Sequence, residues 1–210
     1  MNPGNSLRLV ALLAAIIVIA LAVSAVHPYD RTTWWLEVFP VLIALPLLAA
    51  TWARYPLTPL AYGLIALHAL VLILGGAYTY ARVPLGFLLQ DAFDLARNPY
   101  DRIGHFFQGF VPALLAREIL RRGHYVRGRA MLAFIVLAIV LAISACYELI
   151  EWAAALALGQ GADEFLGTQG DAWDTQWDMF MALIGGSCSL AVLSRWHDRQ
   201  LANLTGRQSI

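Results

Sequence analysis

Residues 130–158 read AMLAFIVLAIVLAISACYELIEWAAALAL, and this stretch decides the fold. Its first half, residues 131–143, contains no charged or amide side chain. A bilayer core of about 30 Å takes roughly 20 mostly apolar residues in a helix. The stretch is therefore predicted to form a transmembrane helix, and it carries Glu148 and Glu151 three residues apart in its second half.

Five further stretches approach the length of a span, and the one at residues 102–120 is the least apolar of the six. They are residues 7–26, 35–53, 57–78, 102–120 and 173–193. The apolar part of the first is too long for a signal peptide, so we expect it to be a retained helix. Residues 84–96 predict a short amphipathic helix at the membrane surface. The predicted fold is all-α: a polytopic membrane protein forming one transmembrane domain, residues 1–210, with about six spans.

The composition agrees with lipid as the main solvent. Hydrophobic residues make up 60% of the chain and charged residues 13%, whereas soluble domains carry about 25% charged residues. The formal net charge is zero, which gives no support for nucleic acid as a partner. We expect membrane lipid to surround the protein. The oligomeric state does not follow from the sequence.

The arginines predict how the chain is oriented. Five lie between residues 117 and 129, and the tail carries Arg195 and Arg199, whereas residues 159–172 contain no arginine. Basic residues favour the cytoplasmic side. With six spans, both termini are then cytoplasmic and residues 159–172 face outward. Arg82, Arg97 and Arg102 oppose this assignment, but the later arginine cluster is denser.

With this orientation, three spans bring ionisable groups to one depth in the outer half of the membrane. Asp101 and His105 are four residues apart on one helix face, as are Asp174 and Asp178. Glu148 lies about 27 Å along its helix, also near the outer end. Ionised groups at such depth cost roughly 2.5–3.5 kcal/mol each and persist when they pair, face a cavity or bind a cation.

We interpret this cluster as a His/carboxylate site. The expected ligands of one divalent metal ion (zinc, manganese or iron) are His105, Glu148, Asp174 and Asp178. The expected catalytic residues are Glu148, Glu151 and Asp174. We expect Asp101, Arg102, Gln108 and Asp171 to surround and position these ligands and catalytic residues.

Structural roles are open for several of these residues. Asp171 and Asp174 suit the start of a helix, where carboxylates accept from free amides. Asp101 has Arg97 and Arg102 as neighbouring partners, and Glu151 is placed to be solvated at the interface. Proton carriers joined by hydrogen bonds would use the same residue types.

Three motifs resemble the YjdF-type family of bacterial inner-membrane proteins. They are DRIGHFFQGF at residues 101–110, ELIEW at 148–152 and GDAWDTQWDM at 170–179. The resemblance covers about residues 7–193. It implies a small multi-pass protein of the bacterial inner membrane, and it carries no established biochemical activity.

The order of motifs is also similar to VanZ-like proteins. Asp101, His105, Glu148 and Asp178 occupy comparable places, but Ala182 stands where those sequences usually have an asparagine. VanZ-like proteins are linked to low-level glycopeptide resistance. The similarity therefore implies work on the cell envelope.

Three functions are consistent with the residues. The first is an envelope enzyme that uses metal-assisted or acid–base chemistry on a lipid-linked or periplasmic substrate. The second is a proton- or cation-coupled transporter, which the apolar stretch between Gln108 and Arg117 disfavours. The third is a non-catalytic partner in membrane assembly, in which the cluster is a structural hydrogen-bond network.

Overall fold

The computed structural model describes residues 3–159 and 163–208 and is all-helical over them. Six long helices form a bundle: α1 (Pro3–Ser24), α2 (Arg31–Thr51), α3 (Pro59–Tyr78), α5 (Tyr100–Arg122), α6 (Arg129–Leu158) and α8 (Asp174–Gln208). A short 3₁₀ turn, η1 (Tyr80–Arg82), leads into α4 (Pro84–Phe93), and α7 (Asp163–Leu166) lies between α6 and α8. The predicted all-α class and the short helix after residue 83 are confirmed.

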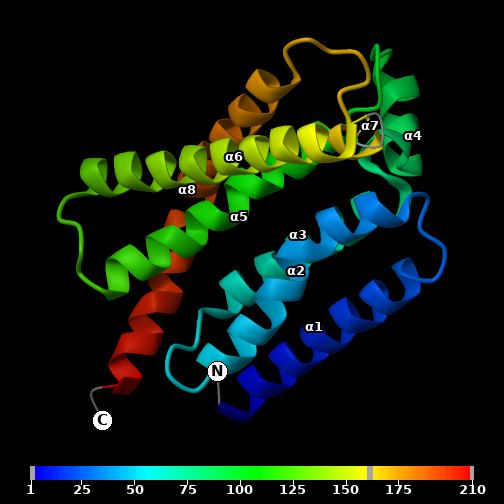
Figure 1. Ribbon diagram of the computed structural model, residues 1–210. Helices are drawn as coiled ribbons and strands as arrows, with labels where there is room; N and C mark the ends of the chain where they lie inside the picture. The colour runs from blue at the N-terminus through cyan, green and yellow to red at the C-terminus, as the bar shows by residue number, and fades with distance from the viewer. Residues whose placement is uncertain (1–2, 160–162, 209–210) are drawn as a thin grey trace.

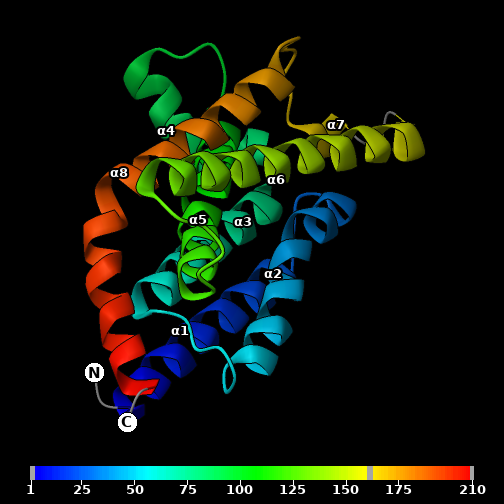
Figure 2. The same ribbon diagram turned by 90° about the vertical axis from the view of Figure 1, so that its left-hand side faces the viewer.

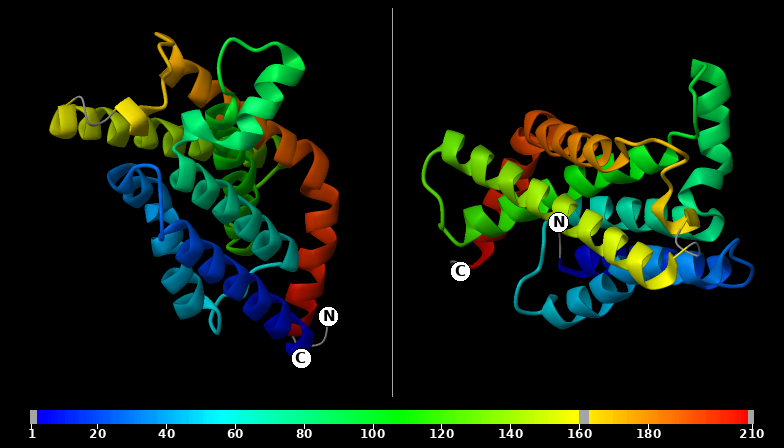
Figure 3. Two further views of the ribbon diagram at one scale, coloured as in Figure 1. Left: turned by 90° about the vertical axis from the view of Figure 1, so that its right-hand side faces the viewer. Right: turned by 45° about the horizontal axis from the view of Figure 1, so that its top comes forward.

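The two ends of the bundle are distinct. Both termini lie at one end, and α4 lies at the other (Figure 1), as the views from either side also show (Figure 2; Figure 3, left). Helices α5 and α8 begin at the α4 end, and α6 ends there. The start of α5, the start of α8 and the second half of α6 therefore lie towards the same end of the bundle.

Five of the described helices are long and apolar enough to cross a membrane: α1, α2, α3, α6 and α8. Helix α5 is not among them, because polar and charged side chains lower its mean hydropathy. It packs against α3, α6 and α8, so much of its polar surface faces protein. That α5 also crosses the membrane stays a prediction.

Helix α8 continues to Gln208, well past the end of the predicted span at residue 193. The reason is amphipathic packing, because His197 and Leu201 are buried while Arg195 and Arg199 are exposed. The helix also curves around α5 (Figure 2). Its Gly185-Gly186-Ser187 run is the kind of sequence at which helices bend.

Two glycines set how closely α5 and α8 approach. A Cβ atom on Gly109 of α5 would collide with the carbonyl oxygen of Ala182, and one on Gly185 of α8 would collide with that of Phe106. The two backbones are therefore in direct contact at their crossing. This contact fixes the start of α8 beside the start of α5, where the ionisable residues lie.

Candidate metal and acid–base site

His105 on α5 is the centre of the polar cluster at the α4 end. Its side chain is buried. The Nε2 atom lies 3.5 Å from Oδ1 of Asp101 and 3.9 Å from Oδ2 of Asp178. The Nδ1 atom lies 3.1 Å from Oε1 of Gln108 and 3.9 Å from Oε1 of Glu148. The structure thus surrounds one imidazole with side chains from α5, α6 and α8.

The contact with Gln108 fits one tautomer of the imidazole. With Oε1 facing the ring, Nδ1 carries the proton and donates it. In a neutral imidazole, Nε2 then presents its lone pair to the carboxylate oxygens of Asp101 and Asp178. Lone pairs facing one another at 3.5–3.9 Å repel. A cation or a further proton between them removes that repulsion.

The donor atoms are also spaced for a metal ion. Asp101, His105 and Asp178 each offer an atom within 4.8 Å of the others, as do His105, Glu148 and Glu151. Metal–ligand bonds of about 2.0–2.1 Å in a tetrahedral site place neighbouring ligand atoms roughly 3.4 Å apart. The distances around Nε2 come close to that value.

Several buried oxygens of the cluster lack partners. Asp101 Oδ2, Glu148 Oε1 and Asp178 Oδ1 make no hydrogen bond to the described part of the chain. Buried polar atoms are normally paired, because desolvation of an unpaired one costs about 1–3 kcal/mol and more when it is charged. A bound cation, a water molecule or a proton would satisfy these three carboxylate oxygens around one imidazole.

A small cavity lies next to the imidazole. Its volume is about 20 Å³, room for about one water molecule or ion. Polar groups that line it come from four elements: Glu37, Tyr80, Asp101, His105, Gln108, Tyr147 and Glu151. Glu151 and the His105 imidazole therefore line the same small cavity.

Asp174 and Asp171, the two other predicted carboxylates, lie against arginines. Asp174 forms an ion pair with Arg97, and its side chain is nearly buried. Asp171 lies 3.1 Å from Arg102 and also accepts from the backbone N–H of Trp173 at 2.9 Å. Neither residue belongs to a described group of possible metal ligands. The two pairs join the start of α8 to the start of α5 and the segment before it.

Three polar members of the cavity wall, Glu37, Tyr80 and Tyr147, are absent from the sequence prediction. Glu37 of α2 is buried and accepts a hydrogen bond of 3.2 Å from the hydroxyl of Tyr147 on α6. Glu37 is the one charged residue within the predicted span 35–53, and an ionisable group inside an apolar span is a functional signal by itself. The sequence gives no such signal for Tyr147.

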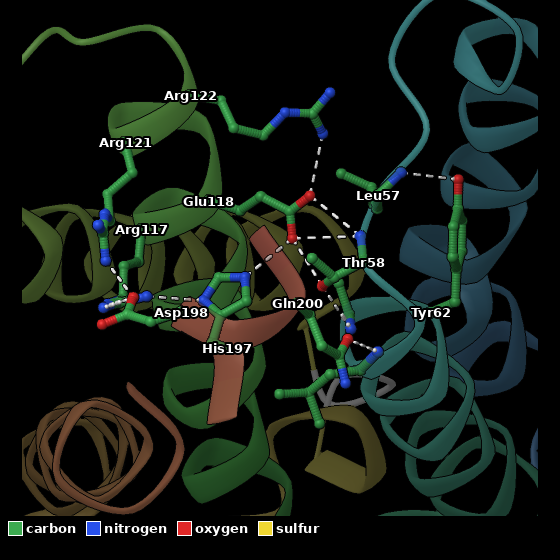
Figure 4. A network of polar contacts seen from close by, with 12 residues as sticks. Leu57, Thr58, Tyr62, Arg117, Glu118, Arg121, Arg122, His197, Asp198 and Gln200 are labelled. Carbon is green, nitrogen blue, oxygen red and sulfur yellow. Dashed lines mark hydrogen bonds and ion pairs between the residues drawn. The ribbon is translucent and has the colours of Figure 1, made fainter. Parts of the chain in front are cut away.

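A second polar network lies towards the other end of α5 (Figure 4). Glu118 is buried and accepts hydrogen bonds from the Thr58 hydroxyl at 2.8 Å and from Arg122 at 3.0 Å. His197 Nε2 lies 3.0 Å from the same carboxylate, and Arg117 lies 2.9 Å from His197 Nδ1. Because arginine only donates, His197 accepts at Nδ1 and donates from Nε2 to Glu118.

This network ties together α5, α8 and the start of α3. Its groups are mutually paired, in contrast with the unpaired oxygens around His105. Paired and buried, it serves packing and orientation. The sequence predicts this arginine-rich segment as a topology signal that also attracts anionic lipids, and it does not reveal the buried pairing of Arg117 through His197 to Glu118.

Comparison with known proteins gives the family. The model of a family described as "Predicted membrane protein (DUF2238)" matches residues 9–199. The chain is 62% identical over 191 residues to a protein of Escherichia coli (strain K12) named "Inner membrane protein YjdF", a match that covers 91% of this chain and 90% of that protein. No solved structure matches the chain. The chain therefore belongs to the family of predicted membrane proteins DUF2238, in agreement with the YjdF-type resemblance of its motifs.

Proposed function

We propose that this chain is an inner-membrane enzyme whose site around His105 binds one divalent metal ion and acts on a lipid-linked or periplasmic substrate. The observation that carries the proposal is the placement of the His105 imidazole, whose Nε2 lies 3.5 Å and 3.9 Å from carboxylate oxygens of Asp101 and Asp178. Nε2 faces Asp101 and Asp178 while Nδ1 is held by Gln108. Metal-binding histidines commonly donate their other N–H to a fixed oxygen in this way.

The ligand set differs in part from the one expected from sequence. His105, Asp101 and Asp178 are the proposed ligands, because their donor atoms converge on one side of the imidazole. Two ionised carboxylates carry two negative charges, which balance a divalent cation. Mixed nitrogen and oxygen donors suit zinc, manganese or iron.

Glu148 and Glu151 are the proposed acid and base. Both lie on α6 facing His105, and Glu151 lines the cavity. A bound divalent metal lowers the pKa of a coordinated water towards neutrality and makes it a nucleophile. A carboxylate beside that water is placed to take its proton, and a second one to protonate a leaving group.

Metal content tests the first half of the proposal. Purified protein is loaded separately with zinc, manganese or iron, desalted and measured by inductively coupled plasma mass spectrometry. Wild-type protein should retain about one ion per chain, and His105→Ala should retain none. His27→Ala, an exposed histidine in the loop between α1 and α2, is the matched control and should behave as wild type.

Turnover tests the second half. Lipid and periplasmic extracts are compared between cells that make wild-type protein and cells that make Glu148→Gln at equal abundance. An enzyme predicts a species that accumulates only with the variant. Metal bound by wild type with identical extracts would instead support a structural role in membrane assembly.

A second candidate is a transporter of protons or cations. The supporting observation is a second buried acid–imidazole contact, between Glu118 on the same helix as His105 and His197 of α8. Thirteen residues of α5, about 20 Å, separate the two sites. Val111, Ala113 and Leu114 in between are buried and apolar, which favours the enzyme. A metal- or proton-dependent flux into proteoliposomes that His197→Ala abolishes would reverse this ranking.

A further inference from the structure

A large cleft lies at the terminal end of the bundle, far from the His105 site. It is bounded by the end of α5, the loop that follows, the start of α6 and the middle of α8. Its volume is about 1320 Å³, above the range of roughly 300–1,000 Å³ usual for small-molecule pockets. A cleft of this size suits an extended ligand.

The cleft is strongly basic. Five arginines line it, namely Arg117, Arg121, Arg127, Arg129 and Arg195, and the one carboxylate in its wall is Asp198. Arg117 and Arg121 both pair with Asp198. Arg127, Arg129 and Arg195 are exposed and make no ion pair with the described residues. The cleft therefore carries a formal charge of about +4 and attracts an anion.

The start of α6 adds a second feature that favours an anion. Gly128 precedes the helix, and no side chain caps the free N–H groups of the first turn. Gly128 and Arg129 both lie in the cleft wall. Free amides together with the positive end of the helix dipole form a ready site for a phosphate group.

The wall beyond the arginines is apolar. Leu132 and Ala133 of α6 and Leu190, Ala191 and Val192 of α8 also line the cleft. These residues belong to the apolar parts of two helices that are able to cross a membrane. An acyl chain can pack against such an apolar wall, whereas a free phosphate or a nucleotide gains no favourable contact from it.

We propose that this cleft binds an anionic glycerophospholipid. The phosphate lies against Arg127, Arg129 and Arg195 at the start of α6, and an acyl chain follows the apolar wall between α6 and α8. Basic pockets between transmembrane helices are suited to lipid phosphates. This site is independent of His105, so either proposal can fail without the other.

Lipid binding is measured on purified, delipidated full-length protein by native mass spectrometry with phosphatidylglycerol as the probe. Phosphatidylcholine and inorganic phosphate are run in parallel. We expect phosphatidylglycerol to bind and to resist competition by inorganic phosphate. The triple variant Arg127→Gln, Arg129→Gln, Arg195→Gln should weaken its binding on the order of tenfold to a hundredfold.

The control is a second triple variant, Arg8→Gln, Arg54→Gln, Arg199→Gln. These arginines are also exposed and predicted to be cytoplasmic, but they lie outside the cleft. Equal loss in both triple variants would show general attraction to charge and overturn the site. Equal binding of phosphatidylcholine would also overturn it, as would displacement by inorganic phosphate, which assigns the cleft to a soluble anion.

Discussion

The Nε2 atom of His105 lies 3.5 Å from Oδ1 of Asp101, one helical turn earlier on α5. Because residues four apart share one face of a helix, the formation of α5 alone brings these two side chains within reach of each other. The third member, Asp178, is added only when α8 packs on α5. The site therefore depends partly on the local geometry of α5 and partly on the packing of α8 against it.

Asp101→Asn should lower metal affinity on the order of tenfold to a hundredfold. The amide has the same shape but loses the charge that balances a divalent cation. Metal titration of purified protein by isothermal calorimetry measures the change. Asp91→Asn on the exposed side of α4 is the charge-matched control and should leave the affinity unchanged. Equal affinities for Asp101→Asn and wild type would exclude Asp101 as a ligand.

Asp174 gives a contrasting prediction, since it pairs with Arg97 and not with His105. Asp174→Asn should lower the free energy of unfolding by about 1.5–3 kcal/mol, because Arg97 loses its nearest counter-charge and keeps only the Asp171 carboxylate at 3.8 Å and the Thr168 carbonyl oxygen. Metal content should stay at the wild-type level. Thermal unfolding in detergent and elemental analysis measure the two effects. A variant that loses its metal while remaining stable would restore Asp174 to the ligand set expected from the sequence.

The sequence predicts the helices well, because lipid imposes a length and an apolar character on each one. Helix α6 begins and ends within a residue of its predicted bounds, residues 130–158. Helix α8 is the exception, since its amphipathic continuation depends on burying His197 against α5. Its hydrogen-bond partner on α5, Glu118, is about 80 residues away in the chain. No local sequence pattern therefore reveals the contact.

The sequence predicts which ionisable residues of the site lie at the same depth in the membrane. His105, Glu148 and Asp178 lie together because α5, α6 and α8 each reach the same end of the bundle. Depth does not decide which way a side chain points. Asp174 and Asp178 lie on the same face of α8 and at a similar depth. Asp174 nevertheless pairs with Arg97, whereas Asp178 lies beside the His105 imidazole. Only the packed structure separates their roles.

Close approach of α5 and α8 predicts a steric effect at Gly109. Gly109→Ala should destabilise the protein by about 1–3 kcal/mol, because the added methyl group collides with the Ala182 carbonyl oxygen. Thermal unfolding in detergent measures the change. Gly63→Ala in α3 is the matched control, since its Cβ atom meets no atom within 4 Å. Alanine favours helix over glycine, so the control should be neutral or gain up to about 1 kcal/mol.

The two substitutions also report on the site. If Gly109→Ala forces α8 away from α5, Asp178 moves from His105 and metal affinity should fall with stability. Gly63→Ala should leave metal binding intact. Unchanged stability in Gly109→Ala would mean that the two helices do not cross as closely as the structure has them.

The positions of the arginines predict how the protein is oriented in the membrane. Both termini lie at one end of the bundle (Figure 3), and the Arg117–Arg129 segment lies with them, because α5 ends and α6 begins there. With basic residues retained in the cytoplasm, both termini should be cytoplasmic and the His105 site should open outward.

A fluorescent protein fused after Ile210 should fold and emit, whereas periplasmic alkaline phosphatase fused there should be inactive. The same two reporters inserted in the exposed loop after α4, at Asp94, should give the opposite pattern. Active phosphatase at the C-terminus would invert the topology and move the His105 site to the cytoplasmic side, which would exclude a periplasmic substrate.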